Sequence, residues 1–208
     1  MPITNVSPTR MELTRLKRRL QTATRGHKLL KDKQDELVKK FIALVNENKA
    51  LRIEVEQELA AAFGNFVVAS GVMTGASLES ALCFPMQQAD VEVGHKNVMS
   101  VLTPRFELHT QRRGSGLPYG LAQTSAELDD ALGRMQKVFE KMVRLAEVEK
   151  SCQLMAFEIE KTRRRVNALE YVMIPSFTES IRTISMKLDE ADRSTRVNLM
   201  KIKSIVQQ

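Results

Sequence analysis

The fold of this chain is decided between Leu13 and Ala62, where the sequence reads LTRLKRRLQTATRGHKLLKDKQDELVKKFIALVNENKALRIEVEQELAAA. Read in sevens, the stretch has apolar residues at eleven of its fifteen core positions, where a 43% hydrophobic chain would have about six by chance. The pattern predicts one coiled-coil helix about 75 Å long. Its core positions are Leu13, Leu16, Leu20, Ala23, His27, Leu30, Gln34, Leu37, Phe41, Leu44, Asn48, Leu51, Val55, Glu58 and Ala62.

Three of the polar core positions are His27, Gln34 and Asn48. A polar residue on a coiled-coil seam usually fixes register and pairing. We therefore interpret these three as candidate seam-register residues and not as ligands or catalysts.

A second long helix is predicted over residues 124–205. Its heptad seam starts at Leu128 and by count passes through Glu149, Cys152, Ala156, Ile159 and Arg163 before Val166. Beyond Met173 two consecutive steps of four form a stutter, and Pro175 lies inside it. Because proline removes a helical hydrogen bond, Pro175 is the candidate site of a kink.

Between the helices, residues 72–121 are rich in Gly, Pro and Ser and lose the heptad pattern. A short helix is predicted over Leu78–Leu82, stopped by Phe84-Pro85. Residues 90–93 and 98–101 alternate at period two around the connection 94–97, which predicts a β-hairpin.

The predicted fold class is therefore all-α dominated. The N-terminal helix (7–71) and the C-terminal helix (124–205) form a long antiparallel two-helix coiled coil, and a small central head (72–121) contains the short helix and the hairpin. Pairing between two chains is the alternative. The near-equal helix lengths and the single insertion favour pairing within one molecule.

The chain has a net charge of +7, and residues 10–40 contain eleven Lys or Arg against four acids. Such a surface favours an acidic partner, which is a nucleic acid, a membrane surface or an acidic protein. The sharpest basic patch is Lys161, Arg163, Arg164 and Arg165. It is either a solvated helix face or a contact with an acidic partner, and Arg163 by count pairs with an acid of the first helix such as Glu12 or Asp35. Aromatic stacking residues do not accompany it, so we expect no nucleic acid as partner.

Other classes of function find little support. No apolar run approaches the ~18 residues of a membrane span, so we expect no membrane insertion. Cys83 and Cys152 form neither a CxxC pair nor a disulfide framework, which fits a reducing cytoplasm. Gly71-Val72-Met73-Thr74-Gly75 lacks the spacing of a phosphate-binding loop. We expect no catalytic residue, no cofactor and no metal.

Four sequence motifs resemble those of a known protein family. PTRMEL (8–13) and ATRGHKLLKDKQDEL (23–37) resemble the opening of the D subunit of V-type and A-type ATPases. AEVEK (146–150) and KTRRRVNALEYVMIP (161–175) are similar to that family's second signature, in the same order. The resemblance covers nearly the whole chain and is weakest in the central head.

The resemblance implies a non-catalytic rotor shaft in the central stalk of a rotary ATPase, peripheral at the cytoplasmic face of the membrane. In that family the A and B subunits of the catalytic hexamer bind and hydrolyse ATP, the F subunit binds the shaft, and the shaft stands on the membrane-side C/d funnel subunit. The shaft couples ATP hydrolysis or synthesis to proton or sodium transport. We expect residues 7–25 and 185–204 to form the tip inside the ring, with Arg10, Arg15, Arg18, Arg19, Arg25, Lys187, Arg193, Arg196 and Lys201 as candidate ring contacts.

Two hypotheses compete with the rotor. A static coiled-coil scaffold would bind one partner without any ATP-linked behaviour. An RNA-binding helical arm would show RNA affinity that falls steeply with salt.

Overall fold

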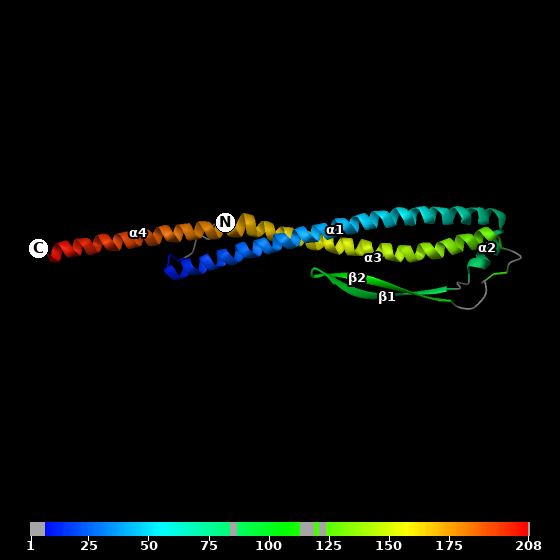
Figure 1. Cartoon of the computed structure of the whole chain (residues 1–208), viewed down its shortest axis with the longest axis horizontal. Helices are drawn as coiled ribbons and strands as arrows, with labels where there is room; N and C mark the ends of the chain where they lie inside the picture. Colours follow the sequence, from blue (N-terminus) through cyan, green and yellow to red (C-terminus); the bar gives the residue numbers. More distant parts are fainter. Residues whose placement is uncertain (1–6, 84–86, 113–118, 121–123, 208) are drawn as a thin grey trace. The chain divides into compact units, whose positions relative to one another are not determined.

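The computed structural model describes residues 7–83, 87–112, 119–120 and 124–207 (Figure 1). The elements in order are α1 (Arg10–Val72), α2 (Gly75–Leu82), β1 (Gln87–Val98), β2 (Val101–Arg112), α3 (Ala126–Ala168), the π-helical turn η1 (Leu169–Met173) and α4 (Ile174–Val206). The predicted helix-dominated fold is confirmed, with a short helix and a two-stranded hairpin between two long helical segments. The stop predicted at Phe84-Pro85 lies outside the described residues.

Contacts divide the chain into two units. One unit consists of residues 1–36 and 159–208, and the other consists of residues 37–158. Helices α1 and α3 each contribute to both units, so each unit contains an antiparallel helix pair made by one chain.

The first unit is held by an apolar seam between α1 and α4. Leu16, Phe177 and Ile184 are 2%, 9% and 3% exposed and pack together, with half-buried neighbours on both helices. Burying one such side chain contributes about 1.5–3 kcal/mol. The pairs Arg10–Asp192 and His27–Glu170 connect α1 to the helical segment opposite it and establish their antiparallel direction.

The second unit pairs α1 with α3. Ala69, Ala81 and Leu128 form a small core between α1, α2 and α3. Further along, Lys141 donates to Glu54 at 2.5 Å and to Glu58 at 2.7 Å. These hydrogen bonds join facing positions of the two helices and oppose their sliding.

The heptad predicted for the first helix is confirmed. All fifteen core positions between Leu13 and Ala62 are buried or half-buried, and Leu16, Leu37, Val55 and Ala62 are at most 5% exposed. The pattern continues beyond the predicted stretch to Ala69, which is fully buried.

The seam counted for the second helix is wrong between positions 148 and 162. The buried residues there are Val148, Ser151, Met155 and Thr162, each one position before the counted residue. The hairpin explains the shift for the first three, because they line the space between the hairpin and α3 and are covered from a second side. A heptad count assumes that only one partner covers the helix.

The hairpin is longer than predicted and turns elsewhere. β1 and β2 pair from Gln87↔Arg112 to Val98↔Val101, so Met99 and Ser100 form the two-residue turn and residues 94–97 belong to β1. The φ angles of Met99 and Ser100, 54° and 70°, are typical of the type I′ turns that suit hairpins. The Asn97 side chain supports the turn by accepting a hydrogen bond from the Ser100 amide at 2.9 Å. Gly94 misled the sequence interpretation because it sits within the strand.

The hairpin lies along α3 (Figure 1) and is attached to it through a carboxylate. Glu147 accepts a hydrogen bond from the backbone amide of Phe106 at 3.0 Å. This bond satisfies an amide of β2 and fixes the hairpin to the helix.

The irregularity predicted around Pro175 is a π-turn directly before it. Leu169–Met173 are π-helical, and Pro175 lies in the first turn of α4. Proline cannot donate to the carbonyl of residue 171 and its ring crowds that carbonyl, which a wider turn relieves. The bend predicted at this place stays a prediction.

Candidate functional site

The candidate site begins with the cations of the first unit. All nine candidate ring contacts, on α1 and α4, are exposed. Arg10 pairs with Asp192 at 2.9 Å and Arg15 with Glu12 at 3.6 Å. Exposed pairs of this kind are worth about 0–1 kcal/mol, so these arginines can exchange their acids for those of a partner.

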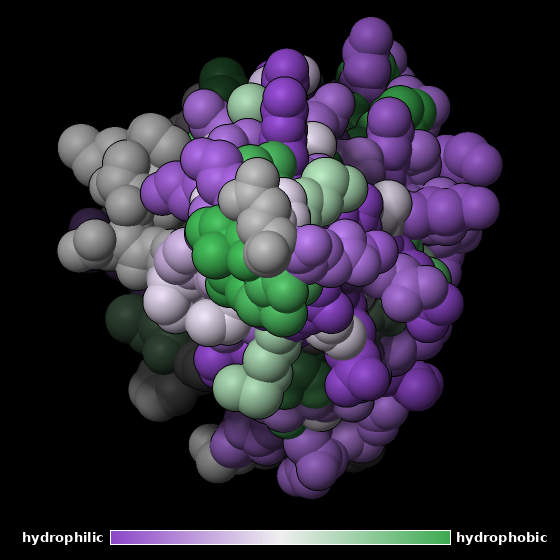
Figure 2. Space-filling view, turned by 90° about the vertical axis from the view of Figure 1, so that its left-hand side faces the viewer, coloured by the Kyte–Doolittle hydropathy of each residue, from purple (hydrophilic) through white to green (hydrophobic). Residues whose placement is uncertain are grey.

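The last part of α4 is exposed to solvent along its whole described length. Residues 189–207 are all exposed, including Ile202 at 57%, Ile205 at 71% and Val206 at 79%. Figure 2 looks on to this end of the helix and shows a group of apolar atoms surrounded by hydrophilic ones. An apolar helix end with a hydrophilic surround is suited to contact with another protein.

The basic patch is a solvent-facing surface in this chain. Lys161, Arg163, Arg164 and Arg165 are exposed, and Arg164 donates to Glu160 one turn earlier. The expectation that Arg163 lies on the seam is wrong, since Thr162 takes that position at 2% exposure. The pairing of Arg163 with Glu12 or Asp35 therefore fails, and Glu12 pairs with Arg15.

The role of the three candidate register residues stays a prediction. His27 contacts Glu170 across the helix pair at 3.3 Å, and Gln34 and Asn48 are half-buried. The His27 contact is polar and joins one position of α1 to one position of η1. It is the kind of contact that distinguishes one register from its neighbours.

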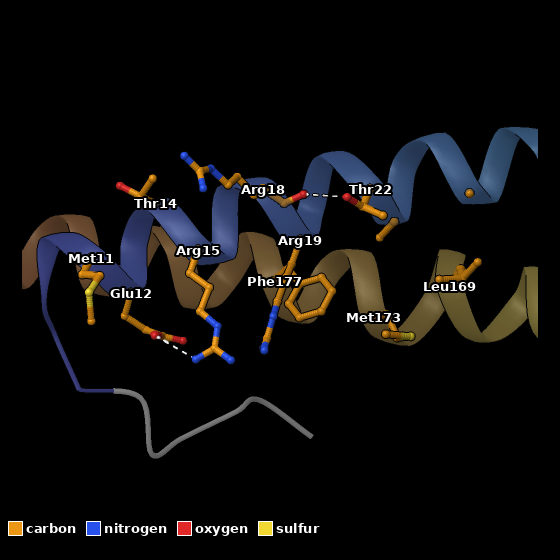
Figure 3. A pocket seen from close by; sticks show the side chains of 12 residues that line it. Met11, Glu12, Thr14, Arg15, Arg18, Arg19, Thr22, Leu169, Met173 and Phe177 are labelled. Carbon is orange, nitrogen blue, oxygen red and sulfur yellow. Dashed lines mark hydrogen bonds and ion pairs between the residues drawn. The ribbon is translucent and has the colours of Figure 1, made fainter.

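A groove opens beside this contact, between α1 and the segment from η1 into α4 (Figure 3). Its volume is about 1120 Å³. Apolar side chains and three arginines line it: Met11, Ala23, Leu169, Met173, Phe177, Arg15, Arg18 and Arg19. The sequence interpretation missed it. The one available signal was Gly26, a glycine in the middle of a strong helix pattern.

Charges in the second unit connect helices. Lys141 is hydrogen-bonded to Glu54 and Glu58, and these bonds raise the pKa of its ammonium group above the ordinary 10.5. Arg144 reaches Glu47 at 3.1 Å and Arg52 reaches Glu149 at 3.8 Å. No sequence pattern indicates these pairs, because they depend on the register between α1 and α3.

Apolar side chains also remain exposed on the second unit. Ile42, Val45 and Ile53 are 54%, 41% and 47% exposed on α1. Later on the same helix Phe63 and Val67 are 51% and 66% exposed. Apolar surface in groups of this kind marks sites where other proteins bind.

Two further observations concern the residues that have described positions. Among them, no three His, Cys, Asp or Glu side chains gather in a way that would hold a metal ion. Within the same ranges, no helix has both the length and the apolar character of a membrane span.

These features define the class of the protein. It is a helical coiled coil, closed within one chain, whose exposed arginines and apolar surfaces are suited to binding other proteins.

Comparisons with known proteins give the family. The family described as the D subunit of ATP synthase matches residues 12–204. The chain is similar to the V-type ATP synthase D subunit of Fusobacterium nucleatum, with 56% identity over 98% of this chain and 97% of that protein. It is 55% identical to the protein of the same name from Clostridium botulinum strain Langeland, over 98% and 96% of the two chains. It is 54% identical to that of Thermoanaerobacter sp., over 99% of each. The chain therefore belongs to the family of ATP synthase D subunits.

Proposed function

We propose that this chain is the rotor shaft in the central stalk of a V/A-type rotary ATPase. In this role it binds no nucleotide itself. The A and B subunits of the catalytic ring hydrolyse or make ATP, and the shaft transmits torque between them and the membrane ring that moves protons or sodium ions. The complex holds it peripherally, at the cytoplasmic face of the membrane.

One observation carries the proposal: each helix is paired with another helix of the same chain. In the first unit, α1 and α4 cannot separate without exposing Leu16, Phe177 and Ile184 to water. In the second unit, the hydrogen bonds from Lys141 to Glu54 and Glu58 oppose sliding between α1 and α3. Torque applied to one helix is then passed to the other.

The surface chemistry suits a contact that must be made and broken repeatedly. Arginines such as Arg18 and Arg19 are exposed and long, and their ion pairs with a protein of the ring would each be weak. Weak pairs prevent the shaft from being trapped at one angle. Their sum can still favour one conformation of the nearest nucleotide-binding protein, which is what coupling requires.

The partners follow from this assignment. The tip, residues 7–25 with 185–204, enters the ring of A and B subunits. The exposed apolar residues Ile42, Val45 and Ile53, with the nearby hairpin, are suited to the F subunit. The central segment with α2 faces the membrane-side C/d funnel subunit, and Phe63 and Val67 offer apolar contacts there.

Cysteine cross-linking in the assembled ATPase tests the placement. After Cys83 and Cys152 are replaced by serine, single cysteines are introduced as Arg19→Cys and Lys201→Cys, with Ser77→Cys in α2 as the comparison. We expect the first two to capture an A or B subunit and the third to capture the C/d funnel. Capture of the funnel alone by Arg19→Cys and Lys201→Cys would reverse the polarity, and capture of none of these partners would refute the assignment.

A further inference from the structure

The groove beside the π-turn is apolar along its floor. Phe177 is 9% exposed at its base, Leu169 is half-buried, and Met173 is 43% exposed. Figure 3 shows Leu169 and Met173 on one wall and the turns of α1 on the other. Both ends of the π-turn therefore contribute side chains to the groove. A partner would need an apolar side chain to fill this space.

Gly26 keeps the α1 wall of the groove open. A Cβ at this position would meet nothing within 4 Å, so helix packing does not require glycine. Glycine inside a helix costs roughly 1 kcal/mol relative to alanine. The helix has this cost without any packing reason within the described unit, and the empty space beside Gly26 belongs to the groove. This is what a site that accepts a side chain from outside would require.

The rim of the groove is positive. Arg15, Arg18 and Arg19 line it together with one acid, Glu12. Arg15 forms an ion pair with Glu12 at 3.6 Å, which Figure 3 marks with a dashed line. Arg18 and Arg19 form no ion pair with any residue that has a described position. Guanidinium groups bind carboxylates in a planar, two-pronged geometry. An occupant with carboxylates beside its apolar group would match both the rim and the floor.

We propose that this groove docks an acidic protein segment that inserts one apolar side chain against Phe177 and places carboxylates on Arg18 and Arg19. The concave floor fits a single inserted side chain better than a flat lipid surface. The burial of Phe177 leaves no exposed ring at the floor for stacking a nucleic-acid base. The proposal rests on the proposed function, within which the segment belongs to an A or B subunit.

A pair of glycine substitutions tests the groove. Gly26→Leu fills the open wall, while Gly133→Leu adds the same side chain on α3, where a Cβ also meets nothing within 4 Å. Both should keep or raise the helical content and the melting temperature, because leucine is the better helix former. We expect Gly26→Leu to weaken binding to the purified ring of A and B subunits about tenfold or more, since the anchor can no longer enter. Gly133→Leu should bind like the original protein, and equal binding by both variants would overturn the proposal.

A photo-cross-link identifies the occupant in the intact ATPase. Benzoylphenylalanine replaces Met173 in the groove or, in a separate variant, Lys201 on the exposed part of α4. We expect the groove probe to capture a segment of an A or B subunit in which Asp and Glu outnumber Lys and Arg.

The two probes separate the failure of this proposal from the failure of the proposed function. Suppose that the probe at position 201 captures an A or B subunit, while the probe at position 173 captures a neutral or basic segment or no protein. This result overturns the groove proposal alone. Capture at position 173 of an acidic segment from a different protein of the complex supports the groove and contradicts its placement in the ring. Absence of any capture at both positions overturns both.

Discussion

Tyr119 and Asp129 form the residue contact with the clearest electrostatic signature. The phenol donates a hydrogen bond to the carboxylate, and burial together with this acid raises the pKa of Tyr119 to about 12. The folded chain thus binds the phenolic proton more tightly than the unfolded chain does. The stability contributed by this proton is complete below pH 10 and is lost as the pH rises from 10 towards 12.

This signature can be measured because the chain has two tyrosines and no tryptophan. In a Tyr171→Phe variant, the absorbance of phenolate reports Tyr119 alone, and we expect half-ionisation near pH 12. Replacing Asp129 with Ala should lower the pKa of Tyr119, since the hydrogen bond and the charge of the acid are gone while burial remains. A pKa of 10.0 in the Tyr171→Phe variant, with helical circular dichroism intact, would contradict the contact.

Single residues also show where sequence reasoning stops. His27 could be assigned to the seam because the heptad around it is nearly all leucine, alanine and phenylalanine. Arg163 could not be placed, because the heptad count gives no sign that the buried position there is Thr162, one residue earlier. The sequence did not predict the apolar groove for another reason. Gly26 and Phe177 are 151 positions apart, and only the register between the two helices brings them to the same groove.

Among the elements that the structure describes, the hairpin turn contains the non-glycine residues with positive φ, Met99 and Ser100. Ser100 has a φ of 70° and is exposed, so its side chain provides no packing that would offset the unfavourable conformation. Left-handed backbone costs a non-glycine residue roughly 1–2 kcal/mol. Ser100→Gly should therefore stabilise the hairpin, whereas Ser100→Val should destabilise it because a β-branched residue tolerates positive φ least.

Native-state hydrogen exchange of the β1 and β2 amides measures this effect. For a gain of about 1 kcal/mol we expect roughly fivefold slower exchange in Ser100→Gly. The Ser100→Val variant should exchange faster, with α1 and α3 amides unchanged in both. Identical strand protection in the two variants would show that the turn does not limit opening of the hairpin.

The sequence predicted the long helices correctly. For the central part it predicted that a hairpin is present but not where the hairpin turns. Fifteen seam positions define α1 so strongly that local detail hardly matters, and all of them are covered in the structure. The hairpin was recognised by its alternation, but Gly94 suggested a turn that Met99 and Ser100 provide. Neither residue is typical of that turn, so composition alone points to the wrong place.

At the scale of the whole molecule, the pairing of α4 with α1 ends near Asp192, before the end of the helix. Arg10 pairs with Asp192 near the start of α1, and all described residues after Asp192 are exposed. Removing residues 193–208 should therefore leave the melting temperature of the protein almost unchanged. If the proposed function holds, the same truncation should weaken ring binding and lower the ions transported per ATP.

Calorimetry and transport assays on the same truncated protein measure the two effects. A control truncation of residues 207–208 should alter neither. A large drop in melting temperature would show that the helix end supports the fold, and unchanged coupling would remove it from the contact with the ring.

The π-turn has a consequence for how this chain tolerates insertions and deletions. A π-helical turn holds about one residue more than an α-helical turn, so Leu169–Met173 contain a spare residue. Losing one residue there would convert the turn to ordinary α-helix and leave the flanking faces in phase. Losing one residue elsewhere in α3 or α4 would rotate every later side chain by about 100° away from its partner on α1. The π-turn is thus a place within the segment from α3 to α4 where the chain can lose one residue while the helix faces on either side stay in phase.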